Sequence, residues 1–155
     1  MDPQNLFLTR PTYNLLRLDH FVVLLCAVAL FAFHLNEVNW WRFAAAFAWP
    51  DLVGYLPGLF YYHSAQRRGA HRSIPPIFYA LYNVTHSLTV NVAVIAVWYL
   101  TIGHWEWAML SLPIHLLGDR SLFGNIYKTP GLSFEPVPHP GFARFIEEYE
   151  HGERW

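Results

Sequence analysis

The sequence predicts an all-α fold, a bundle of four transmembrane helices with both chain termini in the cytoplasm. The first observation is composition: 54% of the 155 residues are apolar and only 14% are charged. The second is that the charges gather near the N-terminus, at residues 67–72 and after residue 128, which leaves long runs almost uncharged. A soluble domain of this length needs a charged surface, so this distribution is typical of a membrane protein.

Four apolar segments have the length of a membrane span, and together they form the predicted membrane domain, residues 18–128. A helix needs about 20 residues to cross roughly 30 Å of hydrocarbon. The segments are residues 18–35, 40–62, 76–100 and 105–127. Backbone polar groups in hydrocarbon have to pair within their own segment, so runs of this length are expected to be helices.

The charged residues between these segments predict the orientation. Lys and Arg collect before the first segment and between the second and third, at Arg10, Arg17, Arg67, Arg68 and Arg72. The other two connections hold almost none. Because positive charge marks the cytoplasmic side, both termini are expected inside the cell. The chain is therefore expected to be a multi-pass protein of the cell (inner) membrane.

The two ends of the chain are expected to lie outside the hydrocarbon. Residues 1–17 are predicted to be a cytoplasmic or interfacial segment, and residues 129–155 a cytoplasmic tail. Apolar and charged residues alternate with helical spacing at residues 142–148, a pattern typical of a short amphipathic helix on the membrane surface. A loosely ordered tail is the alternative interpretation.

Charge and cysteine content exclude some partners. The formal net charge is −1, and no long basic stripe occurs, which excludes nucleic acid. The single Cys26 excludes an internal disulfide and a metal site of the CxxC type. The expected partners are membrane lipids and a lipophilic small-molecule substrate, while association with a second copy of the chain stays open.

Polar residues inside the apolar segments predict a functional site. An ionisable side chain within a bilayer costs at least about 2.5–3.5 kcal/mol, so it persists where it faces another polar group, a metal or a wet cavity. The candidates are Asp51, Asn83, His86, His115, Asp119 and Arg120. At a rise of about 1.5 Å per residue, all except Arg120 were placed roughly 10–18 Å from the cytoplasmic boundary. This common depth predicts one shared site near the middle of the membrane.

The helix faces on which the candidate residues lie also agree with a shared site. His115 and Asp119 are four residues apart and therefore share a helix face. Asp51 lies with Gly54 and Gly58 on a face of small residues, which permits close approach of a neighbouring helix.

Each candidate also has a purely structural interpretation. Asp119 and Arg120 would form an ion pair that anchors the end of a helix. Asn83 would be a hydrogen-bonding link between helices, and His86 a packing histidine. The coincidence of depth favours a functional site over these separate roles.

Four sequence motifs carry a resemblance to a known family. They are LLRLD from Leu15, PDL from Pro50, YNVTH from Tyr82 and HLLGDR from His115. Their order and spacing resemble a small family of bacterial integral membrane proteins to which no activity is assigned. The resemblance covers roughly residues 15–141. It implies that the six candidates above are motif positions. The chain departs from the family pattern at Asp19, where a glutamate is usual, and around His139.

The favoured interpretation is a metal-dependent membrane enzyme. His86, His115, Asp119 and Asp51 would bind a divalent transition metal, zinc or iron, between the helices. A metal with an open coordination position activates water, which predicts a hydrolase acting on a lipid-like substrate. In this interpretation Asp51, Asp119, Asn83 and Arg120 are catalytic, and Arg120 holds a phosphate or carboxylate group of the substrate.

Two alternatives remain open at the level of the sequence. One is an acid–base enzyme without metal, such as an isoprenoid cyclase, in which Asp51 or Asp119 donates the proton. The other is a protein without enzymatic activity: a small transporter, a proton path or an assembly subunit. Haem bound by His86 and His115 belongs to this second group.

Overall fold

The computed structural model contains helices and no strands in the residues it describes, which are 10–69, 74–135, 141, 142, 144, 145, 147 and 148. The helices are α1 (Arg10–Ala32), α2 (Trp40–Pro50), α3 (Leu56–Arg67), α4 (Pro76–Thr85), α5 (Leu88–Ile102) and α6 (Ser111–Gly118). Two π-helical turns, Asp51–Tyr55 and Asp119–Phe123, and two 3₁₀ turns, Leu35–Glu37 and Trp107–Leu110, complete the elements. The all-α prediction is confirmed.

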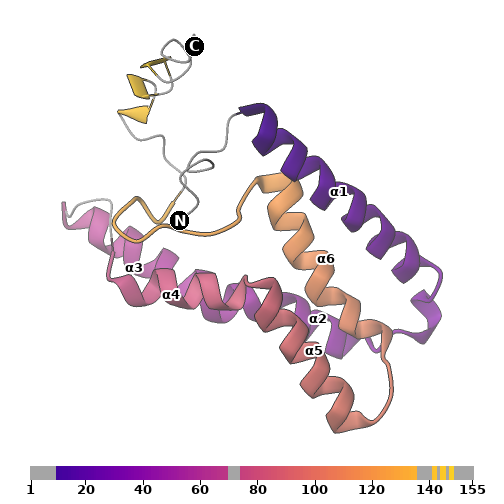
Figure 1. Cartoon of the computed structure of the whole chain (residues 1–155). Coiled ribbons are helices and arrows are strands. Elements are labelled where there is room, and N and C mark those ends of the chain that lie inside the picture. The colour runs from indigo at the N-terminus through magenta and orange to yellow at the C-terminus, as the bar shows by residue number, and fades with distance from the viewer. Residues whose placement is uncertain (1–9, 70–73, 136–140, 143, 146, 149–155) are drawn as a thin grey trace.

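The described helices group into four longer rods (Figure 1). The first is α1, the second is α2 with α3, the third is α4 with α5, and the last is α6 with the short helical turns at its two ends. The π-turn Asp51–Tyr55 joins α2 to α3 without a break in the helical path, while α4 and α5 meet at an angle of 55°. α1 packs along α6, and the π-turn Asp51–Tyr55 packs against α4. The elements that carry the candidate residues are therefore neighbours in space.

Local sequence signals explain where the second and third rods begin. The side chain of Asn39 accepts a hydrogen bond of 3.1 Å from the backbone N–H of Arg42, which caps the start of α2. Pro76 starts α4, where its missing N–H costs no helical hydrogen bond. Both helices begin at the first residue of the predicted segment.

The first helix starts earlier than the predicted boundary between residues 17 and 18, because it is already helical at Arg10. Side chains from this early part tie α1 to the end of the last rod. Arg17 donates to the backbone carbonyl groups of Ser121 (2.9 Å) and Leu122 (2.8 Å), and the Tyr13 hydroxyl donates to that of Gly124 (2.8 Å). These carbonyls lie at a helix C-terminus, where positively charged donors are favoured.

Among the residues that the structure describes, α1 is the one helix that is by itself long and apolar enough to cross a membrane, with a mean hydropathy of 2.1 over its most apolar 18 residues. Helices α4 and α5 pass the same test together, as one bent span. A helix such as α1 near the N-terminus is typical of a membrane span and of a signal sequence alike. These findings support one span, or two if α4 and α5 form a single bent span. A total of four spans remains a prediction.

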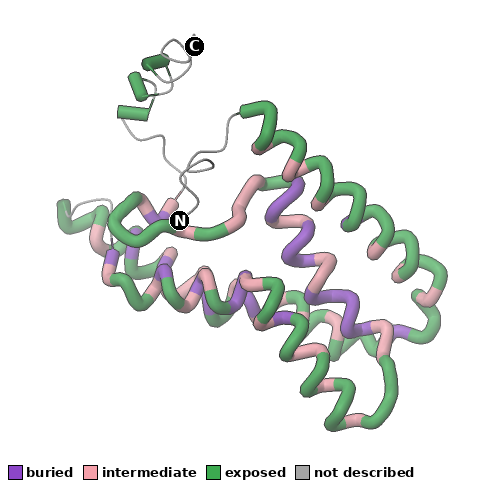
Figure 2. Tube along the Cα trace, viewed as in Figure 1, coloured by how far each residue is buried: buried purple, intermediate pink, exposed green. Residues whose placement is uncertain are grey.

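Burial is concentrated on α6 and at one end of the bundle (Figure 2). Along α6, Leu112 and Leu116 are buried, whereas α1 exposes most of its apolar side chains. At the end where α3 meets α4, Tyr62, Tyr79, Tyr82 and Phe134 form a buried aromatic cluster with Ile74. Phe134 belongs to residues 128–135, here called the return segment, which run back from the last rod to α3 and α4.

Two glycines make these close contacts feasible. A Cβ atom at Gly54 would collide with the hydroxyl of Thr85 and lie 3.1 Å from the Leu81 carbonyl oxygen, so α4 approaches the π-turn at van der Waals distance. This confirms the predicted small-residue contact at Gly54. At Gly58 the space is filled by the ring of Phe134 instead of a helix.

Candidate metal centre

Each of the two candidate carboxylates sits at the first residue of a π-helical turn. The carbonyl of Asp51 accepts the N–H of Leu56, and the carbonyl of Asp119 accepts the N–H of Gly124, five residues ahead in both cases. The first π-turn follows Pro50, which has no N–H to donate to the preceding turn. Such one-turn widenings of a helix are frequent at functional sites.

His86 lies at the break between α4 and α5, where the regular helix stops. The break frees backbone carbonyls, and side chains bind them. The Asn91 amide donates to the carbonyls of Thr85 (2.7 Å) and Ser87 (2.9 Å), and Arg120 donates to that of His86 (3.2 Å). The irregular backbone around His86 is thus satisfied within the protein, as an apolar environment requires.

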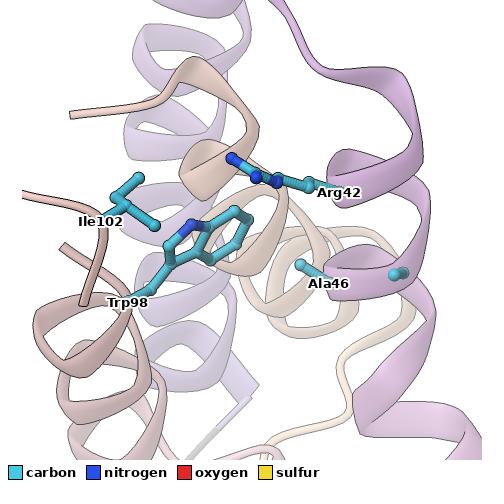
Figure 3. A pocket seen from close by; sticks show the side chains of 5 residues that line it. Arg42, Ala46, Trp98 and Ile102 are labelled. Carbon is cyan, nitrogen blue, oxygen red and sulfur yellow. The ribbon is translucent and has the colours of Figure 1, made fainter. Parts of the chain in front are cut away.

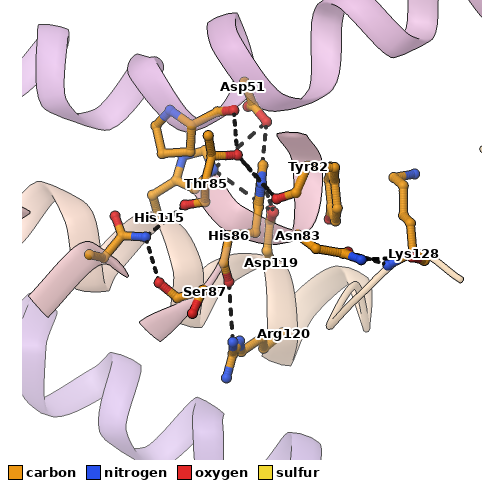
Figure 4. A network of polar contacts seen from close by, with 12 residues as sticks. Asp51, Tyr82, Asn83, Thr85, His86, Ser87, His115, Asp119, Arg120 and Lys128 are labelled. Atoms are coloured by element: carbon orange, nitrogen blue, oxygen red, sulfur yellow. Dashed lines mark hydrogen bonds and ion pairs between the residues drawn. The ribbon is translucent and has the colours of Figure 1, made fainter. Parts of the chain in front are cut away.

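The four predicted metal ligands converge at this break (Figure 4). Nε2 of His86 lies 3.4 Å from Oδ1 of Asp51 and 3.4 Å from Oδ2 of Asp119. Nε2 of His115 lies 3.8 Å and 3.9 Å from the same two oxygens. These separations exceed the roughly 2.7–3.2 Å of an N–H···O hydrogen bond. Both Nε2 atoms are buried, and neither has a hydrogen-bond partner among the described residues.

The other nitrogen of the His86 ring fixes which nitrogen carries the hydrogen. Nδ1 of His86 lies 2.9 Å from the Tyr82 carbonyl oxygen and 3.0 Å from the Thr85 hydroxyl. A carbonyl can only accept, so Nδ1 carries the hydrogen, and in the neutral ring Nε2 keeps a free lone pair. The ring of Phe47 meets the His115 ring edge-on, with centroids 4.9 Å apart, and Nε2 of His115 is buried without a hydrogen-bond partner. In both rings Nε2 is the nitrogen that faces the two carboxylates.

The spacing of these atoms fits a metal ion. Zinc lies about 2.0–2.2 Å from histidine nitrogen and carboxylate oxygen, which places tetrahedral ligand atoms about 3.3–3.6 Å apart. The four nitrogen–oxygen separations, 3.4 to 3.9 Å, are close to that range. Ligand atoms of Asp51, His86 and His115 all lie within 4.8 Å of one another, whereas the fourth predicted ligand, Asp119, is not part of that group. This His/Asp group could hold a metal ion.

The four candidate ligands differ in exposure, and the cluster is more exposed on one side than on the others. The side chains of His86 and His115 are only 3% and 4% exposed. That of Asp119 is 20% exposed and that of Asp51 is 46% exposed. The imidazoles are thus sealed inside the bundle, and Asp51 stands at the edge.

Arg120, predicted to be catalytic, lies outside this cluster. Besides its bond to the His86 carbonyl, its guanidinium lies 3.5 Å from Nε2 of His20 and 3.5 Å from the Tyr127 hydroxyl. Among the described residues no ion pair joins Arg120 to Asp119. The guanidinium instead holds His86 in place through its backbone (Figure 4).

Asn83 is also outside the cluster. Its amide donates to the carbonyl of Lys128 (2.9 Å) and accepts from the N–H of the same residue (2.8 Å). This pair joins α4 to the return segment, which agrees with the structural interpretation of Asn83 as a link. His139 lies outside the described residues.

Three residues that were not among the candidate site residues support His86, two of them directly and the third through Tyr82. Tyr82 stacks on the His86 ring, with centroids 3.9 Å apart and an interplanar angle of 13°. The Thr85 hydroxyl lies 3.2 Å from the Pro50 carbonyl oxygen and so connects His86 to the π-turn of Asp51. Tyr82 precedes His86 by four residues, so helical spacing was a usable signal for it, whereas Thr85 directly precedes His86 and that spacing gives no such signal.

Lys128 is the third of these residues. Its ammonium lies over the rings of Phe134 (4.4 Å), Tyr82 (4.8 Å) and Tyr55 (5.2 Å), and 4.0 Å from Glu135. Burial lowers the pKa of the Lys128 ammonium, and the charge of Glu135 opposes that shift. Nothing local in the sequence predicts this aromatic cage, because its rings come from three separate segments.

A shallow groove between α2 and α5 is separate from the cluster (Figure 3). It is lined by Arg42, Ala45, Ala46, Trp98 and Ile102. None of the four candidate ligands lines it, and it lies toward the other end of the bundle.

Comparison with protein-family models, with curated proteins and with solved structures finds no match to this chain. The functional argument therefore depends on the chemistry and geometry of the residues themselves.

Proposed function

We propose that the chain is a four-span membrane enzyme in which Asp51, His86, His115 and Asp119 bind zinc or iron and promote hydrolysis of a lipophilic substrate. The observation that carries the proposal is the pair of buried Nε2 atoms without hydrogen-bond partners, each 3.4–3.9 Å from two carboxylate oxygens. A buried polar atom without a partner costs about 1–3 kcal/mol. A shared metal ion would remove that penalty at both imidazoles.

Surface properties support the membrane part of the proposal. Large apolar side chains are exposed along α1 and α5, for example Leu15 (61%), Val97 (64%) and Leu100 (77%). Soluble monomers rarely expose apolar patches of such extent. The four helical rods correspond to the four predicted segments, and the irregular backbone between α4 and α5 has its carbonyls bonded internally.

The distribution of exposure supports an enzyme rather than a closed structural metal site. A catalytic metal site keeps one position open, whereas a structural site is closed on all sides. With these four side chains as ligands, the open position would be a fifth one, on the side of the half-exposed Asp51. A bound divalent metal would lower the pKa of water and polarise a carbonyl or phosphoryl oxygen.

The residues around the proposed centre would then have different roles in hydrolysis. Asp51 would hold the metal through Oδ1, and its second carboxylate oxygen, at the open side, would take a proton from the attacking water and return it to the leaving group. His86, whose Nδ1 hydrogen is committed to the Tyr82 carbonyl, and His115 would serve as ligands. Arg120 and Thr85 position His86, and neither contacts the open side.

Geometry also ranks the alternatives. Haem between His86 and His115 is disfavoured, because two carboxylate oxygens occupy the space around both ring nitrogens that the macrocycle would need. A metal-free acid–base enzyme is the second candidate, favoured by the half-exposed carboxylate of Asp51. This candidate can be distinguished from the metal-dependent enzyme by one measurement: its activity would survive removal of metal.

Elemental analysis of the purified protein in detergent tests the proposal. We expect about one zinc or iron ion per chain in the wild type and loss of that ion in His115→Ala. His104→Ala is the matched control, because the His104 side chain is 67% exposed and lies outside the cluster. Circular dichroism verifies that each variant is helical, and Asp119→Asn replaces His115→Ala if the latter does not fold. A folded wild-type protein that binds no transition metal refutes the proposed function.

A further inference from the structure

We infer that the proposed metal centre opens sideways, through Asp51, toward the hydrocarbon of the bilayer and not toward water at either end of the bundle. The substrate class is then an amphiphile dissolved in the bilayer that carries a hydrolysable carbonyl or phosphoryl group. This inference rests on the proposed function and adds the route by which ligands reach the metal.

One end of the bundle is closed by stacked aromatic rings. Tyr82 covers the face of His86, at 3.9 Å between centroids. Phe134 of the return segment meets Tyr82 edge-on at 6.3 Å and stacks with Tyr55 at 6.0 Å. Phe134 is itself only 1% exposed. Water at this end is therefore separated from His86 by two layers of buried rings.

Hydrogen bonds hold the return segment over this end. The Tyr79 hydroxyl donates to the carbonyl of Leu132, and the Tyr55 hydroxyl donates to the carboxylate of Glu135 at 3.0 Å. The two hydrogen bonds between the Asn83 side chain and the backbone of Lys128 fix the beginning of the segment. The closure is thus tied to α3, α4 and the first π-turn at several points.

The opposite end is closed by the start of the last rod. Ala108, Met109, Ser111 and Leu112 lie between this end and His115, and all four are fully buried. The ring of Phe47 covers His115 from α2, with centroids 4.9 Å apart. Neither imidazole is reached from this side.

The exposed ligand faces outward among apolar residues. The Asp51 side chain is 46% exposed, and its neighbours in the same π-turn, Leu52 and Val53, are 58% and 46% exposed. Phe47, one helical turn before Asp51, is 40% exposed. In the proposed orientation this belt of apolar side chains lies in hydrocarbon, so the open side of the centre faces acyl chains.

Two chelators that share their binding nitrogens but differ in solubility test the route. The protein is loaded with zinc in lipid nanodiscs, where both aqueous faces are accessible, and zinc release is followed with 1,10-phenanthroline and with its charged, membrane-excluded disulfonated diphenyl derivative. We expect phenanthroline to remove zinc at least about tenfold faster, because it partitions into the bilayer.

Variants of the return segment supply the control. Phe134→Ala removes the ring that closes the aqueous end, and we expect it to accelerate release to the charged chelator by at least about tenfold. Tyr79→Phe, which loses only the hydroxyl that holds Leu132, is expected to act in the same direction and more weakly. Leu132→Ala, at a side chain that is 51% exposed on the same segment, is expected to change nothing.

The outcomes separate this inference from the proposed function. A protein that retains no metal before any chelator is added refutes the metal centre itself. A metal-loaded protein that releases zinc equally fast to both chelators, or to neither, leaves the centre standing and overturns the sideways route.

Discussion

The candidate metal centre and the polar cluster at the other end of the bundle use the same residue types in opposite ways. The second cluster, called here the outer cluster, consists of His34, Glu37, Arg42, Trp98, Glu106 and Trp107. Each of its carboxylates has two partners. Glu37 accepts from Trp107 and pairs with His34, both at 3.0 Å. Glu106 accepts from Trp98 at 3.1 Å and pairs with Arg42. In the metal centre the same kinds of groups face each other without hydrogen bonds.

This difference separates a structural cluster from a candidate site. In the outer cluster each polar group finds its partner in the protein, and the ring of His34 also stacks on Trp107 at 3.6 Å. In the metal centre the two buried Nε2 atoms have no such partner. A buried polar atom without a hydrogen-bond partner is therefore a better sign of a functional site than residue type or burial alone.

Loss of the Thr85 hydroxyl is expected to give the largest effect among the variants that spare the four ligands. Thr85→Val removes a contact of Nδ1 of His86 and the link to the Pro50 carbonyl. We expect metal affinity to fall about 10- to 100-fold, as for other residues that orient a ligand. Competition titration with a zinc-binding dye measures this change. Thr85→Ser retains the hydroxyl and should bind as the wild type does; equal affinities for the valine and serine variants would contradict the positioning role.

An intermediate effect, on stability alone, is expected in the outer cluster. Glu106→Gln removes the charge that pairs with Arg42 and weakens the bond to Trp98. Since the Arg42 side chain is 47% exposed, we expect a loss of only about 1 kcal/mol in the free energy of unfolding, with unchanged metal content. Thermal unfolding and elemental analysis give the two readouts. Loss of metal in this variant would erase the distinction between the two clusters.

The smallest effect is expected from the pH dependence of the outer cluster. Hydrogen bonds from His34 and then Trp107 lower the pKa of the Glu37 carboxyl below its ordinary value of 4.5. A lowered pKa in the folded state stabilises the protein above the pKa of the unfolded chain, and this contribution is lost as the pH falls through the folded value. Thermal unfolding between neutral pH and pH values below 4.5 should therefore show a slightly weaker pH dependence in Glu37→Gln than in the wild type. A stronger dependence in the variant would contradict the assignment.

Much of the site could be predicted from the sequence. The all-α class follows from long uncharged apolar runs. The common depth of Asp51, His86, His115 and Asp119 predicted a cluster, and the structure brings these four together. The spacing of four residues between His115 and Asp119 was sufficient to place them on one face.

Other features depend on contacts between distant segments and had no local signal. The π-turn at Asp51 fits the close approach of α4 at Gly54, and the partner of Asn83 lies in the return segment. Arg120 follows Asp119 directly, yet successive residues of a helix point in different directions, which carries the guanidinium away from the carboxylates. Adjacency to Asp119 in the sequence therefore does not place Arg120 in the cluster.

The order in which the ligands occur along the chain has a consequence for biosynthesis. Asp51 emerges from the ribosome first, then His86, and the pair His115 and Asp119 only with the last rod. A nascent chain that is arrested before residue 115 carries half of the ligand set, with the return segment still to be synthesised. If the proposed centre binds a metal, the ion would consequently be loaded only into a chain that extends past residue 119, and a chain truncated before that point would have no complete centre to fill.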